Sequence, residues 1–219
     1  MLDLDDPEIR LAISYAPRVA QAGVTALFAL DARLGQLARS GRDPMVAQLR
    51  LTWWHDALLK LDTAPPPAEP ILQALAKEVA QSGISGAALA GLVEGWEVLL
   101  DAPPVDLALV AQRGAALFAL AAQRLGDPAP SAAVAAGGGA WALADYARHA
   151  ADATERERAL DALRAATPPP ATRWPRALRT LGALAVLALW DGNRAAGRNE
   201  PQAAPARILR MAAMALFGR

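Results

Sequence analysis

Apolar residues recur along the chain at the three- and four-residue spacing of amphipathic helices, and no segment sustains the alternation typical of a strand. Prolines, glycines and capping residues divide this pattern into separate segments. A short helix is expected to open at Pro7, and further helices are predicted over about 17–40, 44–63, 71–81, 85–101, 104–126, 131–152, 155–166, 176–192 and 203–217. These nine or ten helices predict an all-α fold, a bundle of antiparallel helices that forms one domain over residues 1–219.

One predicted helix contains three consecutive glycines, Gly137, Gly138 and Gly139. A glycine in a helix interior costs roughly 1 kcal/mol relative to alanine. The three glycines therefore predict a kink or a break in this helix. The alternative is that another backbone or a ligand approaches the helix closely at this point.

The composition is that of a folded protein, with 54% hydrophobic and 20% charged residues. Basic and acidic residues balance at 22 each, so no basic excess is available to neutralise a nucleic-acid backbone. The chain has no cysteine, which excludes disulfides, zinc–thiolate sites and thiol catalysis. Arginine greatly outnumbers lysine, and alanine, glycine and proline are abundant, which is typical of a GC-rich and therefore bacterial genome.

The acidic first ten residues contain no apolar core of a secretory signal, and the longest strongly apolar run, 181–190, is far shorter than the ~20 residues of a membrane span. We therefore expect a cytoplasmic protein without a transmembrane segment. The last predicted helix places Arg207 and Arg210 beside apolar residues, which leaves peripheral membrane contact open. Docking of this helix onto the bundle is the simpler interpretation.

The segment LADYARHAAD, 143–152, carries the clearest candidate chemistry, since no phosphate-binding loop, dinucleotide fingerprint or HExxH motif is present. Asp145, His149 and Asp152 are spaced i, i+4 and i+7, which places them on one face of a helix. Such a stripe can hold a divalent cation. Arg148 stands between the two acids, and surface ion pairs explain the same residues. On spacing alone, ion pairs are favoured.

The segment MVAQLRLTWWHDALLKL, 45–61, sets Trp53 and Trp54 side by side. Neighbouring residues of a helix point about 100° apart, so the two rings have different surroundings. Trp54 shares a face with leucines and is expected in the core. Trp53 shares its side with Arg50 and Asp56, and this side either lines a pocket or lies at the rim of the bundle.

The segment ALFALDARLGQLARSGRDPMVAQLRLTWWHDAL, 26–58, resembles the N-terminal signature of the squalene/phytoene synthase superfamily, in which an ALYAFCR..DD..D helix precedes one with RL..WR..L. The later segments LVEGWEVLL, ALFALAAQRLG, GGAWALADYARHAAD, RALRTLGALAVLALWDGNRAA and PARILRMAAMALFG follow in the family's order. The resemblance extends over nearly the whole chain and implies the isoprenoid-synthase-like helical fold.

The resemblance also implies where the family's metal-binding motifs should fall. In active members, two aspartate-rich motifs on facing helices hold Mg²⁺ ions that bind and ionise an allylic diphosphate. The first motif maps onto Gly35, Gln36 and Arg39, none of which is a carboxylate. Asp31 lies one turn earlier and does not match the pattern.

The second motif is altered in a different way. It maps onto Asp145, Arg148, His149, Asp152 and Ala153. Arg148 matches the family's arginine, and Asp152 keeps an acidic side chain where the family has one. His149 replaces a key aspartate of the motif. The resemblance therefore implies a degenerate, non-catalytic member for which no cofactor is expected. It is similar to the branch that contains the mitochondrial complex I assembly factor, whose AFNVELAQV helix is likewise poor in aspartate beside ALDARLGQL in this chain.

Three functions remain open at this point: an assembly or scaffold protein that acts through a protein partner, an isoprenoid-binding protein, and an active prenyltransferase. The third would condense allylic isoprenoid diphosphates head to head and would need Mg²⁺ at an unusual site. An acid from elsewhere, such as Asp31 or Glu94, could rebuild such a site. The residues expected to line the substrate pocket are Trp53, Asp56, Gln36, Arg39 and Arg148, with Asp145, His149 and Asp152 as a vestigial metal site.

Overall fold

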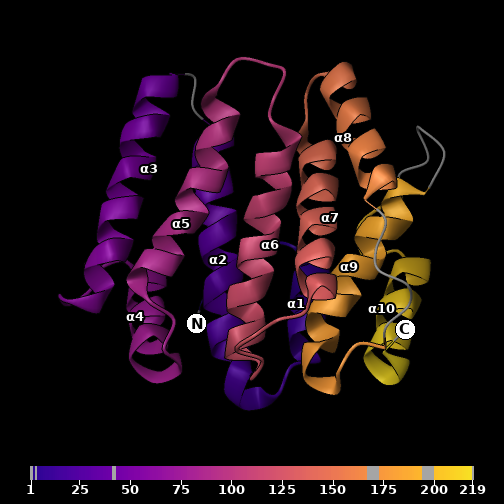
Figure 1. Ribbon diagram of the computed structural model, residues 1–219, viewed down its shortest axis with the longest axis horizontal. Coiled ribbons are helices and arrows are strands. Elements are labelled where there is room, and N and C mark those ends of the chain that lie inside the picture. The colour runs from indigo at the N-terminus through magenta and orange to yellow at the C-terminus, as the bar shows by residue number, and fades with distance from the viewer. Residues whose placement is uncertain (1, 3, 41–42, 167–172, 194–199, 219) are drawn as a thin grey trace.

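The computed structural model describes residues 2, 4–40, 43–166, 173–193 and 200–218. Within these ranges the chain forms ten α-helices and no strand, which confirms the predicted all-α fold (Figure 1). The α-helices are α1 (Pro7–Ser14), α2 (Arg18–Ser40), α3 (Pro44–Leu59), α4 (Pro70–Ser82), α5 (Gly86–Glu97), α6 (Leu107–Arg124), α7 (Ala132–His149), α8 (Ala153–Ala165), α9 (Arg179–Gly192) and α10 (Pro205–Phe217). Short 3₁₀ turns are η1 (Lys60–Asp62), η2 (Val98–Leu100) and η3 (Arg176–Leu178).

The aspartate–proline pairs open helices as the sequence predicts. Asp6 accepts hydrogen bonds from the backbone N–H groups of Glu8 (2.8 Å) and Ile9 (3.1 Å), and Asp43 accepts one from Met45 (2.9 Å). In both helices a proline follows the cap, where its missing N–H has no helical partner to lose.

The start of α8 differs from the sequence prediction. The sequence predicts a helix over 155–166, but α8 begins at Ala153 with Asp152 as its N-cap, and the Asp152 carboxylate accepts from the backbone N–H of Glu155 at 3.0 Å. The preceding helix α7 correspondingly ends at His149 and not near Asp152. The Asp152 side chain satisfies a free N–H group in the first turn of α8, which favours the start of a new helix there and separates α8 from α7.

Helix α2 lies in the middle of the bundle, whereas α3 and α10 lie at its two ends (Figure 1). An aromatic cluster joins α2 to α6 and α7, with Phe28 at 6.3 Å from Phe118 and 5.6 Å from Trp141 between ring centroids. Both pairs adopt the edge-to-face arrangement that aromatic quadrupoles favour. None of the helices in the described part of the chain is long and apolar enough to cross a membrane.

A buried arginine joins the first and last helices. The side chain of Arg207 on α10 is 2% exposed and pairs with Glu8 of α1, with Nε–Oε1 at 2.5 Å and Nη2–Oε2 at 2.9 Å. Its Nη1 also contacts the Asp191 carboxylate of α9. This arrangement fixes α10 against the bundle, because a buried charge must keep its partners.

The three glycines of α7 do not interrupt the helix, which runs unbroken over Ala132–His149. The expected break is therefore wrong, and the alternative of a close backbone approach is correct. The Gly138 carbonyl of α7 lies directly against Gly114 of α6, where a Cβ on either glycine would overlap the other residue's carbonyl oxygen. At Gly139, by contrast, a Cβ would meet its nearest neighbours, atoms of Ala111, at an ordinary 3.4 Å.

Gly138→Ala is expected to lower the free energy of unfolding by about 1–3 kcal/mol, because the α6–α7 backbones must separate. The matched variant Gly139→Ala is expected to leave stability unchanged or to raise it by up to about 1 kcal/mol, through helix propensity alone. Urea unfolding followed by circular dichroism measures both. Equal effects of the two substitutions would contradict the close approach.

Candidate functional site

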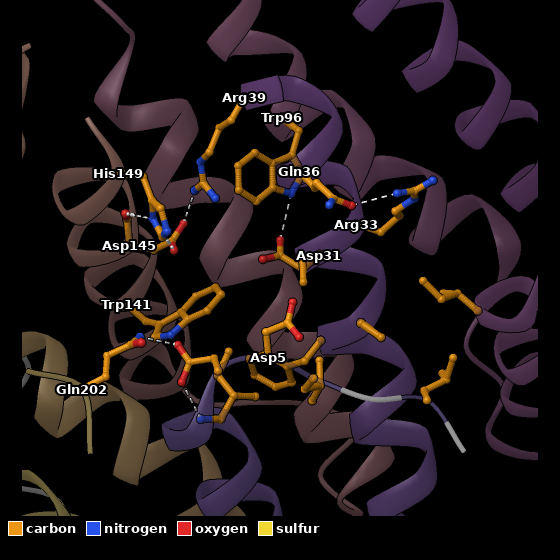
Figure 2. A pocket seen from close by; sticks show the side chains of 18 residues that line it. Asp5, Asp31, Arg33, Gln36, Arg39, Trp96, Trp141, Asp145, His149 and Gln202 are labelled. Carbon is orange, nitrogen blue, oxygen red and sulfur yellow. Dashed lines mark hydrogen bonds and ion pairs between the residues drawn. The ribbon is translucent and has the colours of Figure 1, made fainter. Parts of the chain in front are cut away.

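A cavity of about 460 Å³ lies between α2, α5, α7 and the N-terminal segment (Figure 2). Its apolar wall consists of Leu2, Leu4, Ile9, Phe28, Ile71, Trp96 and Trp141. Its polar wall consists of Asp5, Asp6, Asp31, Arg33, Gln36, Arg39, Asp145, His149 and Gln202. The volume falls within the range of small-molecule pockets.

Asp31 of α2 is the most deeply placed acid of the cavity, at 4% exposure. Its Oδ1 accepts hydrogen bonds from Trp96 Nε1 at 2.9 Å and from Arg113 Nη1 at 2.7 Å. Burial raises the pKa of Asp31, and the charge of Asp145 adds to that rise, while Arg113 offsets only part of it. Asp31 is therefore held by two donors and is not a free ligand.

Arg113 of α6 joins the two acids of the site. Its side chain is 2% exposed, and its Nη2 lies 3.5 Å from Asp145 Oδ2 while Nη1 is bound to Asp31. The guanidinium carbon lies 3.8 Å from the centroid of Trp96, a cation–π contact. Gly95 makes room for this arginine, since a Cβ there would come within 2.6 Å of Arg113 Cβ.

Asp145 of α7 has three cationic or potentially cationic neighbours. Arg39 Nη2 donates to Asp145 Oδ2 at 2.6 Å, and His149 Nδ1 lies 3.2 Å from Oδ1. Burial by itself would raise the pKa of Asp145. The hydrogen bond from His149 and the charges of Arg39 and Arg113 outweigh burial and hold that pKa well below its usual range.

These side chains form an internally neutral network of two carboxylates and two guanidiniums: Asp31, Asp145, Arg39 and Arg113. Mg²⁺ requires oxygen ligands in near-octahedral geometry, and here Asp31 Oδ1 and Asp145 Oδ2 already accept from guanidinium groups. The charge of Arg39 repels a metal ion at the place where one would bind Asp145. The residues present do not fit a Mg²⁺ cluster, and within the described ranges no three His, Asp or Glu side chains are grouped so that they could hold a metal ion.

The structure brings together Gln36, Arg39, Asp145 and His149 of the sequence-predicted residues, all in the wall of the cavity. Gln36 accepts from Arg33 Nη1 at 2.8 Å (Figure 2). Arg148 lies outside this cavity, where it pairs with Asp191 of α9 at 3.3 Å and borders two smaller pockets.

The remaining predicted residues lie elsewhere. Trp53 is 48% exposed and lines a separate groove that it shares with Trp54 and Gln36. Asp56 is exposed beside His55, and Asp152 caps α8, so the helical spacing of Asp145, His149 and Asp152 does not apply. Trp54 is 3% exposed, which confirms its predicted place in the core.

Asp31, Trp96, Arg113 and Trp141 are the residues that sequence reasoning did not place in the site. The sequence marks Asp31 only as an acid that could rebuild a metal site, and Glu94, the other such acid, is exposed and outside the cavity. Arg113 gave one usable signal, a single charge in the apolar helix segment LALVAQRGAALFAL. A lone charge in such a segment indicates a buried partner.

Arg113→Leu is expected to lower the free energy of unfolding by about 3–5 kcal/mol, because it leaves the Asp31 carboxylate buried without its cation. The double variant Asp31→Asn with Arg113→Leu should recover part of the loss. Arg39→Leu is the matched control: it removes an ion pair to Asp145 whose arginine side chain is 29% exposed, and it should cost less than about 1 kcal/mol. Chemical unfolding of the four proteins measures these differences, and similar losses from both single arginine variants would contradict the role assigned to Arg113.

The hydrogen bond with Asp145 raises the pKa of His149, although burial acts in the opposite direction. Because the folded-state pKa lies above the unfolded value of about 6.5, protonated His149 stabilises the fold below that pH, and the contribution disappears as pH rises through the folded-state pKa. His149→Gln should therefore reduce stability at about pH 5.5 and have little effect at about pH 9. Urea midpoints across this range test the expectation, which fails if the difference between the two proteins does not change with pH.

The squalene/phytoene synthase family model matches residues 4–112 of the chain. No curated protein and no solved structure gives a significant match. The matched residues include helices α1 to α5, the start of α6, and the cavity residues Asp31, Arg39 and Trp96. The ten-helix fold agrees with the helical fold expected for this family. Residues 4–112, which include Asp31 and Arg39 of the charged network, are therefore similar to the squalene/phytoene synthase family.

Proposed function

We propose that the chain is a non-catalytic member of the squalene/phytoene synthase family that binds an isoprenoid in the cavity between α2, α5 and α7. The observation that carries this proposal is the network of Asp31, Arg113, Asp145 and Arg39. Guanidinium groups occupy the carboxylates that metal ions would have to bind. Without metal ions to neutralise a departing diphosphate, the ionisation step of the family's reaction has no support.

The charge of the cavity favours a neutral isoprenoid over a diphosphate. Its wall contains four aspartates, including Asp5, whose side chain points into the cavity in Figure 2, against Arg33 and Arg39. A diphosphate would face this negative excess without a bridging cation. The aromatic and aliphatic wall provides apolar surface for a prenyl chain, and Arg39 provides a donor for a hydroxyl or carbonyl group.

Two other functions remain as alternatives. An active prenyltransferase would use an unusual metal site, and the exposed carboxylate of Asp5 is the observation that favours it. An assembly or scaffold role through a protein partner rests on the aspartate-poor segment ALDARLGQL, which resembles the assembly-factor branch. An isoprenoid-binding protein can also act as a scaffold, so these two roles are compatible. Metal-dependent binding of a diphosphate would instead favour the active prenyltransferase.

Isothermal titration calorimetry with farnesol and with farnesyl and geranylgeranyl diphosphates, each with and without Mg²⁺, tests the proposal. Farnesol should bind without Mg²⁺, and Mg²⁺ should not strengthen the binding of either diphosphate, because Arg39 and Arg113 already neutralise the acids. Diphosphate binding that requires Mg²⁺ would overturn the proposal in favour of an active enzyme.

Ala32→Trp locates the bound ligand. Ala32 is an exposed residue of α2 that lines the cavity, so a bulky side chain fills the cavity without entering the packed core. Ala22→Trp on the same helix is the matched control, because Ala22 is also exposed and is not among the cavity residues. Farnesol affinity should fall at least about tenfold in Ala32→Trp and stay unchanged in Ala22→Trp. Unchanged affinity in both would place the ligand elsewhere.

A further inference from the structure

Helix α10 presents an apolar face that the bundle does not cover. Its largest exposed residues are Ile208, Leu209, Leu216 and Phe217, at 39%, 70%, 67% and 56% exposure. They stand at i, i+1, i+8 and i+9, with the partly buried Ala212 and Ala213 between them, and so form two parallel rows along one side of the helix. The face contains no charged residue and is about 12 Å long.

This face is presented by a fixed helix. The opposite side of α10 buries Arg207, Met211 and Met214, and Arg207 is paired with Glu8 and Asp191 in the interior. Rotation of α10 to cover its outer face would break these ion pairs and leave a buried charge. The outward direction of Leu209 and Phe217 is therefore a property of the folded bundle.

The stretch of sequence that contains α10 is rich in arginine, and five of its arginines, Arg173, Arg176, Arg179, Arg207 and Arg210, lie in the part of the chain that the structure describes. Residues 173–219 contain eight arginines and two acids, whereas residues 1–172 contain 14 basic and 20 acidic residues. The chain is neutral in total, so residues 173–219 carry a net positive charge and residues 1–172 carry an equal net negative charge. Of the two acids, Asp191 is already paired with Arg207 and Arg148.

Two of these arginines adjoin the apolar face directly. Arg173 Nε donates to the Phe217 carbonyl oxygen at 2.9 Å, and Arg179 Nη1 donates to the Leu216 carbonyl oxygen at 2.7 Å. Arg176, between them in the chain, is exposed. Guanidinium groups thus lie beside the two exposed residues that end the helix, in the arrangement expected of an interfacial helix at an anionic surface.

We propose that the outer face of α10, with Arg173, Arg176 and Arg179 beside it, docks on the surface of a membrane that contains anionic lipid. The apolar rows enter the headgroup region, and the arginines meet lipid phosphates. A second copy of the chain is a poor occupant, because a symmetric contact would bring Arg173, Arg176 and Arg179 of the two copies together. The end of the molecule that α3 forms then faces away from the membrane (Figure 1).

Flotation of the purified protein with lipid vesicles tests the proposal. Vesicles of phosphatidylcholine alone are compared with vesicles in which a third of the lipid is phosphatidylglycerol, at low and high salt. The protein should float with the anionic vesicles, and salt should weaken the association because it screens the arginines. Failure to bind anionic vesicles, or equal binding to both kinds, would overturn the proposal.

Matched substitutions at the two ends of the molecule identify the docking face. Leu209→Glu should reduce the vesicle partition coefficient at least about tenfold. Leu49→Glu alters an equally exposed leucine, at 65% exposure, on α3 and should change nothing. Arg176→Gln should reduce the partition coefficient roughly fivefold, and Arg50→Gln on α3 should not. Equal losses at both ends would overturn the assignment to α10.

Sedimentation velocity over a range of protein concentrations tests whether a second copy of the chain covers the outer face of α10 in place of a membrane. If the protein dimerises, Leu209→Glu dissociates the dimer and neither protein binds vesicles, then the face is an interface between copies and the membrane proposal is wrong. A monomer that floats with anionic vesicles supports the proposal. None of these measurements depends on the cavity, so their outcome is separate from that of the isoprenoid titrations.

Discussion

The buried guanidinium of Arg113 is the constraint on which the centre of the structure depends. It lies between Asp31 and Asp145, and so ties α2, α6 and α7 together through charges that water cannot reach at Asp31. A buried arginine is tolerated only when its donors are satisfied, and here two carboxylates and the face of Trp96 satisfy them. The same arrangement shapes the chemistry of the cavity, because it engages one oxygen of Asp31 and one of Asp145 with guanidinium groups.

The electrostatics of the cavity are the basis on which we propose a non-catalytic member of the squalene/phytoene synthase family. A diphosphate-ionising site needs clustered carboxylates whose repulsion is relieved only by cations brought with the substrate. In this chain Arg39 and Arg113 relieve that repulsion, and the hydrogen bond from His149 together with these two charges lowers the pKa of Asp145 against the effect of burial. The cavity is partly apolar, and this apolar wall is the reason we propose that it binds a neutral prenyl chain.

The first and last helices are connected by a second buried arginine. Arg207 holds α10 to Glu8 of α1, the helix whose Ile9 lines the cavity. The helix α10, which carries the exposed apolar face, is thus joined directly to α1, which forms part of the cavity wall. A membrane surface at α10 and an apolar ligand in the cavity would accordingly be served by the same packed bundle, without any need for separate domains.

The sequence by itself determined the all-α fold, the number of helices and most of their boundaries, because apolar periodicity and aspartate–proline caps act within a few residues. It also indicated the resemblance of residues 4–112 to the squalene/phytoene synthase family, and it has no carboxylate at Gln36 or Arg39. Only the tertiary structure decided that Gly138 is a contact and not a break, that Trp53 lies outside the cavity, and that Arg113 reaches Asp31 and Asp145 from 82 and 32 residues away. These outcomes depend on which helices become neighbours, and helical spacing carries no information about the neighbour a side chain will meet.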